Sequence, residues 1–351
     1  MNMKFKSHLI YIFSFLPLAL SAQTQVTEYN PGATAEGVVY SLPRTAITTE
    51  VQAIKTVYTP GEFARYAERY LHVQGVKRQA ETQWTVLGLK VFEEGEPDTL
   101  KTFVIKHKDK STAANVQMTG NGLLAAINTE QQLESHALPQ GNTTHHARDG
   151  KKYLTGEILE AASSAKMAEL IAQEIFDIRD SKNSIRRGQA DSMPKDGASL
   201  RIVLDDLDEQ EEALLQMFVG YTDTTVVYER YTVVPKEDIK KEVLFRFSAK
   251  NGFVDSDDLQ GEPYYITVTD KHSAQMPNEK EAAKRKVNGV VYNIPGTADV
   301  TISTMTKTLY DQELPMGQFG TIDMLNNALF NKGAAPKVTF NVATGALLRI
   351  E

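Results

Sequence analysis

A ten-residue motif occurs twice in this chain. The first copy reads Gly37-Val-Val-Tyr-Ser-Leu-Pro-Arg-Thr-Ala46, and the second reads Gly289-Val-Val-Tyr-Asn-Ile-Pro-Gly-Thr-Ala298. Seven of the ten positions match, at an offset of 252 residues. Valine, threonine and tyrosine are common in any strand, but shared strand composition does not explain the matching glycine and proline. We therefore predict that the motif is duplicated and opens two related β units.

The residues after each copy alternate in opposite phase. Ile47, Thr49 and Val51 are the apolar or β-branched positions of the first copy, whereas Val300 and Ile302 fall one residue out of step in the second. A shift of one residue reverses the two faces of a strand. Either a bulge intervenes in one copy, or the two copies bury opposite faces.

The pattern between the copies predicts an α+β fold with two β-rich units. Residues 83–92 and 102–105 have strand character and are separated by the turn-rich segment 94–98, and Asn121-Gly122 is typical of a tight hairpin. Apolar residues spaced by three and four over 158–178 and 200–218 predict two amphipathic helices that form a hairpin on one β unit. The expected divisions are a signal peptide at 1–22, an N-terminal β-rich unit at 23–150, a helical hairpin at 151–219 and a C-terminal β-rich unit at 220–351.

The first 22 residues have the layout of a secretory signal peptide. Lys4 and Lys6 are followed by an apolar run from Leu9 to Leu20, and then by the small residues Ser21-Ala22. The run is shorter than the ~20 apolar residues of a membrane-spanning helix. We expect cleavage between Ala22 and Gln23, no integral membrane segment afterwards, and an exported protein that is periplasmic or associated with the outer membrane.

Charge and composition argue against several functions. The net charge of −7 disfavours nucleic acid as a partner, because phosphate binding requires a basic surface. The chain has no cysteine, so it has no disulfides, thiol nucleophile, thiolate metal site or thiol-linked lipid. Stability must therefore come from packing and hydrogen bonding.

No motif of catalysis, cofactor binding or metal binding is convincing in this sequence. His-Glu-x-x-His, Gly-x-Ser-x-Gly and the phosphate-binding loop are all absent. Six acids crowd residues 205–212, but on a helix they spread over an outer face and do not converge on one ion. The pair His145-His146 lies in a polar segment typical of an exposed loop. We predict no catalytic residue, no cofactor and no metal.

Two weaker patterns concern glycans. Trp84, Tyr264 and Tyr265 are candidates for stacking against a ligand, although aromatic residues on strands more often pack in a core. A carboxylate pair for glycoside hydrolysis also stays open, because the spacing of acids in sequence does not give their spacing in the fold.

Several segments together resemble an uncharacterised family of exported proteins from Bacteroides-type bacteria, a domain of unknown function. The segments that carry the resemblance are 37–45, 165–169, 175–179, 191–197, 245–248 and 261–265. The likeness covers nearly the whole chain after the signal peptide, and it implies export and one architecture but no catalytic residues. It also implies glycosylation at Thr99 and Ser192, because each follows an aspartate and precedes an apolar residue.

These observations favour an exported envelope protein with a non-catalytic binding or assembly role, whose partner is an envelope protein or a glycan. The alternatives are a glycan-directed hydrolase that uses a carboxylate pair, or a surface adhesin.

Overall fold

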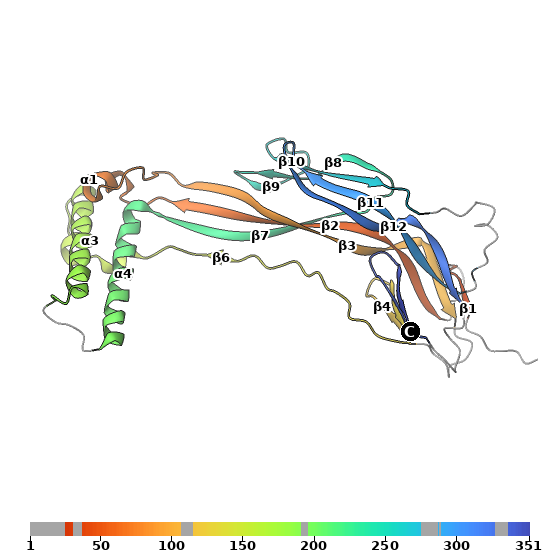
Figure 1. Cartoon of the computed structure of the whole chain (residues 1–351). Helices are drawn as coiled ribbons and strands as arrows, with labels where there is room; N and C mark the ends of the chain where they lie inside the picture. The colour runs from red at the N-terminus through yellow and green to blue at the C-terminus, as the bar shows by residue number, and fades with distance from the viewer. Residues whose placement is uncertain are drawn as a thin grey trace, which may run out of the picture.

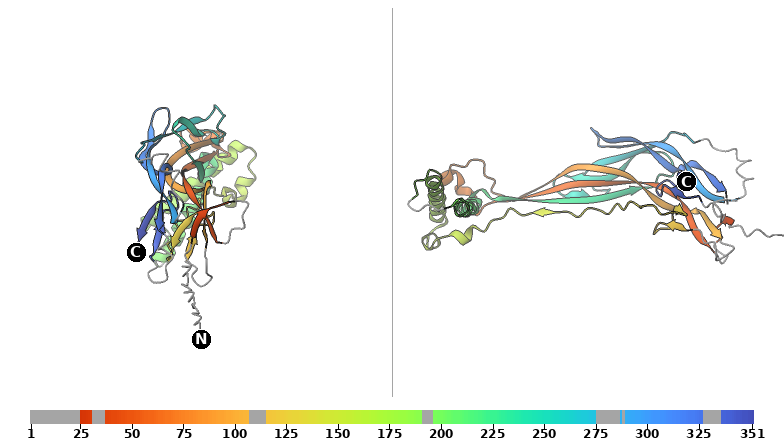
Figure 2. Two further views of the ribbon diagram at one scale, coloured as in Figure 1. Left: turned by 90° about the vertical axis from the view of Figure 1, so that its right-hand side faces the viewer. Right: turned by 60° about the horizontal axis from the view of Figure 1, so that its bottom comes forward.

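The protein is an elongated molecule with helices at one end and sheets at the other (Figure 1, Figure 2). This computed structural model describes residues 25–30, 37–106, 115–190, 196–274, 287, 289–326 and 336–351. The expected cleavage site at Ala22 and Gln23 and the expected modification site at Ser192 lie outside these residues.

The first sheet, here called the long sheet, runs through most of the molecule. Its strand order is β1-β3-β2-β7-β6, and every neighbouring pair is antiparallel. The strands are β1 (Gln25–Glu28), β2 (Val38–Thr59), β3 (Glu81–Lys106), β6 (Thr143–Thr144) and β7 (Tyr221–Val233). At about 3.3 Å per residue, the 22 residues of β2 extend over roughly 70 Å.

A second sheet covers one face of the long sheet. Its order is β12-β11-β10-β8-β9. The strands are β8 (Ile239–Ser248), β9 (Gly252–Val254), β10 (Glu262–Asp270), β11 (Gly289–Ser303) and β12 (Thr308–Asn326). Ile47 of β2 is fully buried in one cluster with Ile266 and Val300, so a hydrophobic core lies between the two sheets.

A small third sheet pairs a hairpin from the first half of the chain with the C-terminal hairpin. Its order is β14-β13-β5-β4, and it consists of the hairpin β4 (Val116–Met118) to β5 (Leu124–Ile127) and the hairpin β13 (Val338–Phe340) to β14 (Leu347–Ile350). Strands that precede the helices in sequence thus pair with strands that follow them, both here and between β2 and β7. The result is a β-rich α+β fold. The hairpin predicted at Asn121-Gly122 is confirmed by the β4–β5 pairing and by φ of 88° at Gly122.

The two motif copies begin β2 and β11 and make matching contacts with a hairpin turn. The amide of Ser41 donates to the Gly122 carbonyl at 3.0 Å, and the amide of Asn293, 252 residues later, donates to the Gly345 carbonyl at 2.9 Å. The buried faces are nevertheless reversed.

Val39 is 39% exposed where its counterpart Val291 is buried, and Tyr40 is buried where Tyr292 is half-buried. Of the two explanations for the opposite phases, the second therefore holds: the copies bury opposite faces.

The turn expected at 94–98 is a continuation of strand β3. Pro97 pairs with Pro43 of β2, and four residues, 98–101, bulge outward before pairing resumes between Thr102 and Ser41. Gly95 is required by close packing, because a Cβ there would come within 2.0 Å of the Val342 carbonyl oxygen. Gly95 thus allows a close backbone contact, and Pro97 lies at the start of a bulge. Neither residue reverses the direction of the chain.

Candidate functional site

The helical end, here called the head, is set apart from the three sheets. It contains the short helices η1 (Ala64–Tyr66), α1 (Ala67–Leu71), η3 (Gly150–Tyr153) and α2 (Gly156–Leu159), and the two long helices α3 (Ser164–Arg186) and α4 (Gly197–Val219). Figure 1 shows it at the far end of β2, β3 and β7.

The two long helices begin where the sequence provides capping side chains. Ser163 accepts a hydrogen bond from the amide of Lys166 at 3.2 Å, and Asp196 accepts from the amides of Ala198 and Ser199. The predicted helical hairpin is confirmed, although α3 extends to Arg186, further than the periodicity indicated.

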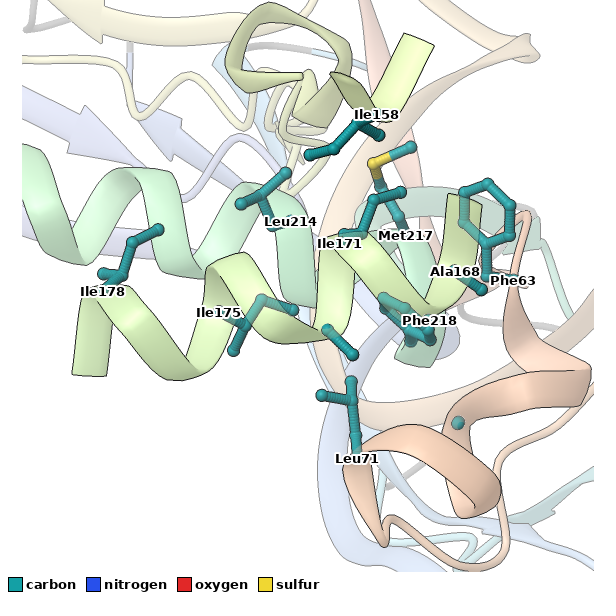
Figure 3. Packing of buried hydrophobic residues seen from close by; sticks show 12 residues of the cluster. Phe63, Leu71, Ile158, Ala168, Ile171, Ile175, Ile178, Leu214, Met217 and Phe218 are labelled. Carbon is teal, nitrogen blue, oxygen red and sulfur yellow. The ribbon is translucent and has the colours of Figure 1, made fainter. Parts of the chain in front are cut away.

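The expectation that the hairpin packs on a β unit is wrong. Its apolar faces instead form a separate core with the segment that follows β2 (Figure 3). Ile171, Ile175 and Leu214 are fully buried there, beside Phe63 and Phe218, whose ring centroids lie 5.8 Å apart. The stripes are covered because η1 and α1 supply the third side of a small helical bundle.

Charged residues link the outer halves of the two long helices. The side chain of Lys182 is 10% exposed and pairs with Asp208 and, at 2.6 Å, with Glu211. Arg179 also donates to Glu211 at 2.6 Å. Burial raises the pKa of Glu211, but the hydrogen bonds from Lys182 and Arg179 outweigh it and leave the pKa lowered.

One stripe of α4 faces away from this core and combines apolar and acidic side chains. Ile202 is 69% exposed, and Asp205, Asp206 and Glu209 follow it at helical spacings of three, four and seven. Arg201 lies 3.6 Å from Asp205, at the edge of the stripe. The expected outward direction holds for Asp205, whose side chain is 68% exposed, but not for Glu211, which is 16% exposed and lies between the helices beside Lys182 and Arg179. This stripe, here called the α4 stripe, is the candidate partner surface.

The three aromatic residues considered for ligand stacking lie in different surroundings. Tyr264 is buried and stacks on Phe245 with centroids 4.3 Å apart, and Trp84 packs at the edge of the same cluster. Tyr265 follows Tyr264 on β10 and is half-buried, with the ammonium of Lys241 5.1 Å from its ring centroid.

Thr99 lies in the outward bulge of β3. It is exposed, and its neighbour Leu100 is 93% exposed. Asp98 accepts a hydrogen bond from the Leu100 amide at 3.1 Å, which shapes the bulge. The site is thus a strand bulge where a loop was expected, and it is sterically accessible.

A long extended segment contains His145-His146, the pair expected in an exposed polar loop. Residues 129–149, here called the strap, run from the small sheet along the long sheet to the head (Figure 1, Figure 2). The ring of His136 packs on Phe92 at 4.3 Å, and His145 lies 3.5 Å from Asp223. Only the lack of an apolar period marked this segment.

Neither a metal cluster nor a membrane span is found in the described part of the chain. Those residues contain no group of three or more His, Asp or Glu side chains placed to hold a metal. Their helices also lack the length and apolar character needed to cross a membrane.

Comparison with known families gives one match. The model of the family described as Domain of unknown function (DUF4831) matches residues 36–348. The chain belongs to this family. The DUF4831 region includes both motif copies, the head and the strap, so these features lie within one family region. The comparisons with curated proteins and with solved structures found no match.

Proposed function

We propose that this DUF4831 protein is exported to the cell envelope, where it is periplasmic or associated with the outer membrane, and has a non-catalytic binding or assembly role. Export is supported by the basic start, the apolar run and the small residues before Gln23. The observation that carries the binding role is the head, a separate helical bundle held at the end of strands extending over roughly 70 Å.

The partner of the head is a basic surface of another envelope protein. The α4 stripe exposes Ile202 among Asp205, Asp206 and Glu209, whereas its flanking Arg201 is the single basic residue of helix α4. An exposed apolar residue within a charged rim is typical of protein interaction sites. Acidic side chains around it favour basic partners and steer their approach.

Two finer features belong to the same proposal. We infer that the two motif copies, which begin β2 and β11, arose by duplication, a view supported by the matching turn contacts of Ser41 and Asn293. Thr99 is the glycosylation site of the β3 bulge, and Ser192 is a second one. Intact-mass measurement of the exported protein, with Thr99→Ala and Ser192→Ala variants, tests both sites.

Photo-crosslinking in the producing cells tests the partner surface. A benzophenone side chain replaces Ile202 in the head or, as a control, Leu259, which is 84% exposed in the turn between β9 and β10. We expect a discrete cross-linked species in the envelope fraction from position 202 only, and an N-terminus at or near Gln23. Equal cross-linking from both positions, or an intact Met1, would contradict the proposal.

A further inference from the structure

A cavity of about 660 Å³ lies under the strap, at the end of the molecule opposite the head. Strap residues 131–134 and 136 form its roof. Leu348, which is 58% exposed, and the half-buried Val342 form its apolar floor. Its volume falls within the ~300–1,000 Å³ range that is usual for small-molecule sites.

The roof is fixed at both ends and is therefore part of the folded structure. At one end, Gln131 and Gln117 exchange two hydrogen bonds of 2.8 and 2.9 Å, and the side-chain Nε2 of Gln131 donates to the Phe340 carbonyl at 2.9 Å. At the other end, the His136 ring packs on Phe92. Residues 132–134, between these anchors, also line the cavity.

The polar rim is rich in amides and carboxylates. Gln132, Asn121 and Asn341 contribute amides, and Glu94 and Glu134 contribute carboxylates. One carboxylate oxygen of Glu94 accepts a hydrogen bond from Thr48 at 2.7 Å, which orients the group. Of the described residues that line the cavity, none is lysine or arginine.

This combination selects the chemistry of a ligand. An anion is disfavoured, because the rim carries carboxylates and no fixed positive charge to balance it. A simple cation would leave the apolar floor and the amides unused. A sugar ring has an apolar C–H face for the floor and hydroxyl groups that both donate to carboxylates and accept from amides.

We propose that this cavity binds a neutral saccharide of one or two rings. The site is distinct from the α4 stripe, which lies at the other end of the molecule (Figure 1). A negative result for one proposal therefore does not contradict the other.

The test measures binding of neutral disaccharides to the full-length protein. Maltose, cellobiose, lactose and N,N′-diacetylchitobiose are titrated by calorimetry and by saturation-transfer NMR, together with one disaccharide that contains glucuronic acid. We expect at least one neutral probe to saturate with a Kd between about 10 μM and about 10 mM, and the anionic probe to bind more weakly. No saturation by any neutral probe at about 20 mM, or tighter binding of the anionic probe, would overturn the proposal.

Two variants locate the binding. Among the described residues, the exposed Gln132 side chain has no hydrogen-bond partner, so Gln132→Trp covers the opening without removing a contact of the fold. We expect it to weaken binding at least tenfold, whereas Gln189→Trp, on the exposed surface of the head, leaves binding unchanged. Glu134, whose side chain is 87% exposed, becomes neutral in Glu134→Gln, which should strengthen binding of the anionic probe. Equal effects of the two tryptophan variants would place the sugar elsewhere and overturn the assignment.

Discussion

The hydroxyl of Tyr40 bonds to both backbone groups of Val291: it accepts from the amide at 2.9 Å and donates to the carbonyl at 3.2 Å. Tyr40 belongs to the first motif copy and Val291 to the second, so one side chain joins the two copies. The strand β10 pairs with β11 only from Ala298 onward, so within the described part of the chain no strand pairs with Val291 on its other side. The Tyr40 hydroxyl therefore makes the two hydrogen bonds that a neighbouring strand would otherwise make. Burial raises the pKa of this hydroxyl, which keeps it protonated as a donor.

Replacing Tyr40 with Phe should lower the free energy of unfolding by about 2 kcal/mol, since it leaves two buried backbone groups unpaired. Urea unfolding, followed by the fluorescence of Trp84, measures the change. The matched control is Tyr292→Phe, whose hydroxyl makes a longer bond of 3.3 Å to Asp323 and is partly exposed; it should cost about 0.5 kcal/mol. Similar losses from the two variants would show that the bridge to Val291 has no special weight.

Two leucines of α4 distinguish the buried and open parts of the head. Leu214 is fully buried, so Leu214→Asp places an unpaired charge in the core and should unfold the head, at a cost of more than about 4 kcal/mol. Leu204 lies on the outer half of α4 and is half-buried, so Leu204→Asp should cost less than about 1.5 kcal/mol. Circular dichroism at 222 nm during thermal unfolding compares them. A larger loss from Leu204→Asp would mean that the outer half of α4 is covered by more structure than we describe.

Removing Lys182 tests the ion-pair cluster of the head. Lys182→Met keeps the aliphatic stem but leaves Glu211 with Arg179 alone, and should cost about 2 kcal/mol at neutral pH. Hydrogen bonding from Lys182 holds the pKa of Asp208 below its usual range, and the pKa of Glu211 is also lowered. The extra stability of the wild type over Lys182→Met is therefore complete above about pH 4.5. It is lost as the pH falls through the folded-state pKa values of these two carboxyl groups. Urea unfolding of both proteins at neutral and acidic pH checks this, and a difference that does not shrink in acid would contradict it.

Because of Tyr231, we expect the free energy of unfolding to decrease in alkaline solution. Burial, with a smaller effect of Glu229, raises the pKa of Tyr231 to about 12, whereas an unfolded tyrosine ionises near ~10. Between these values the unfolded chain has released a proton that the folded chain keeps, so stability is complete below about pH 10 and falls as pH rises toward 12. Unfolding midpoints at about pH 9 and about pH 11 measure the fall, which Tyr231→Phe should reduce and Tyr29→Phe, at an exposed position, should not. An equal fall in all three proteins would remove Tyr231 as its cause.

The sequence was most informative where a pattern depends on neighbouring residues. The apolar spacing predicted the helices α3 and α4, and Asn121-Gly122 predicted a hairpin, because both patterns are local. The packing of the helices was mispredicted, because nothing local in the apolar residues of α4 indicates that Phe63, far earlier in the chain, covers them.

The candidate sites depended even more on distant contacts. The cavity brings together Glu94, Asn121, Gln132 and Asn341, from four separate segments, and no sequence spacing connects them. The exposure of Asp205 was predictable from its helical position, but the burial of Glu211 beside Lys182 and the isolation of the head were not. That isolation depends on the lengths of β2 and β3, and the segment 94–98 concealed the length of β3 because its glycine and proline resemble a turn.

The yield of the Ile202 cross-link, with and without a reversal of charge beside it, tests the central claim most directly. Asp205→Lys with Asp206→Lys changes two exposed side chains of the α4 stripe and spares Glu209, whose carboxylate accepts from the Tyr153 hydroxyl beside the head core. If the head binds a basic envelope partner, the charge reversal should reduce the cross-link at position 202 at least tenfold, while helicity and unfolding midpoint stay the same. A cross-link of undiminished yield in the reversed protein would contradict the account.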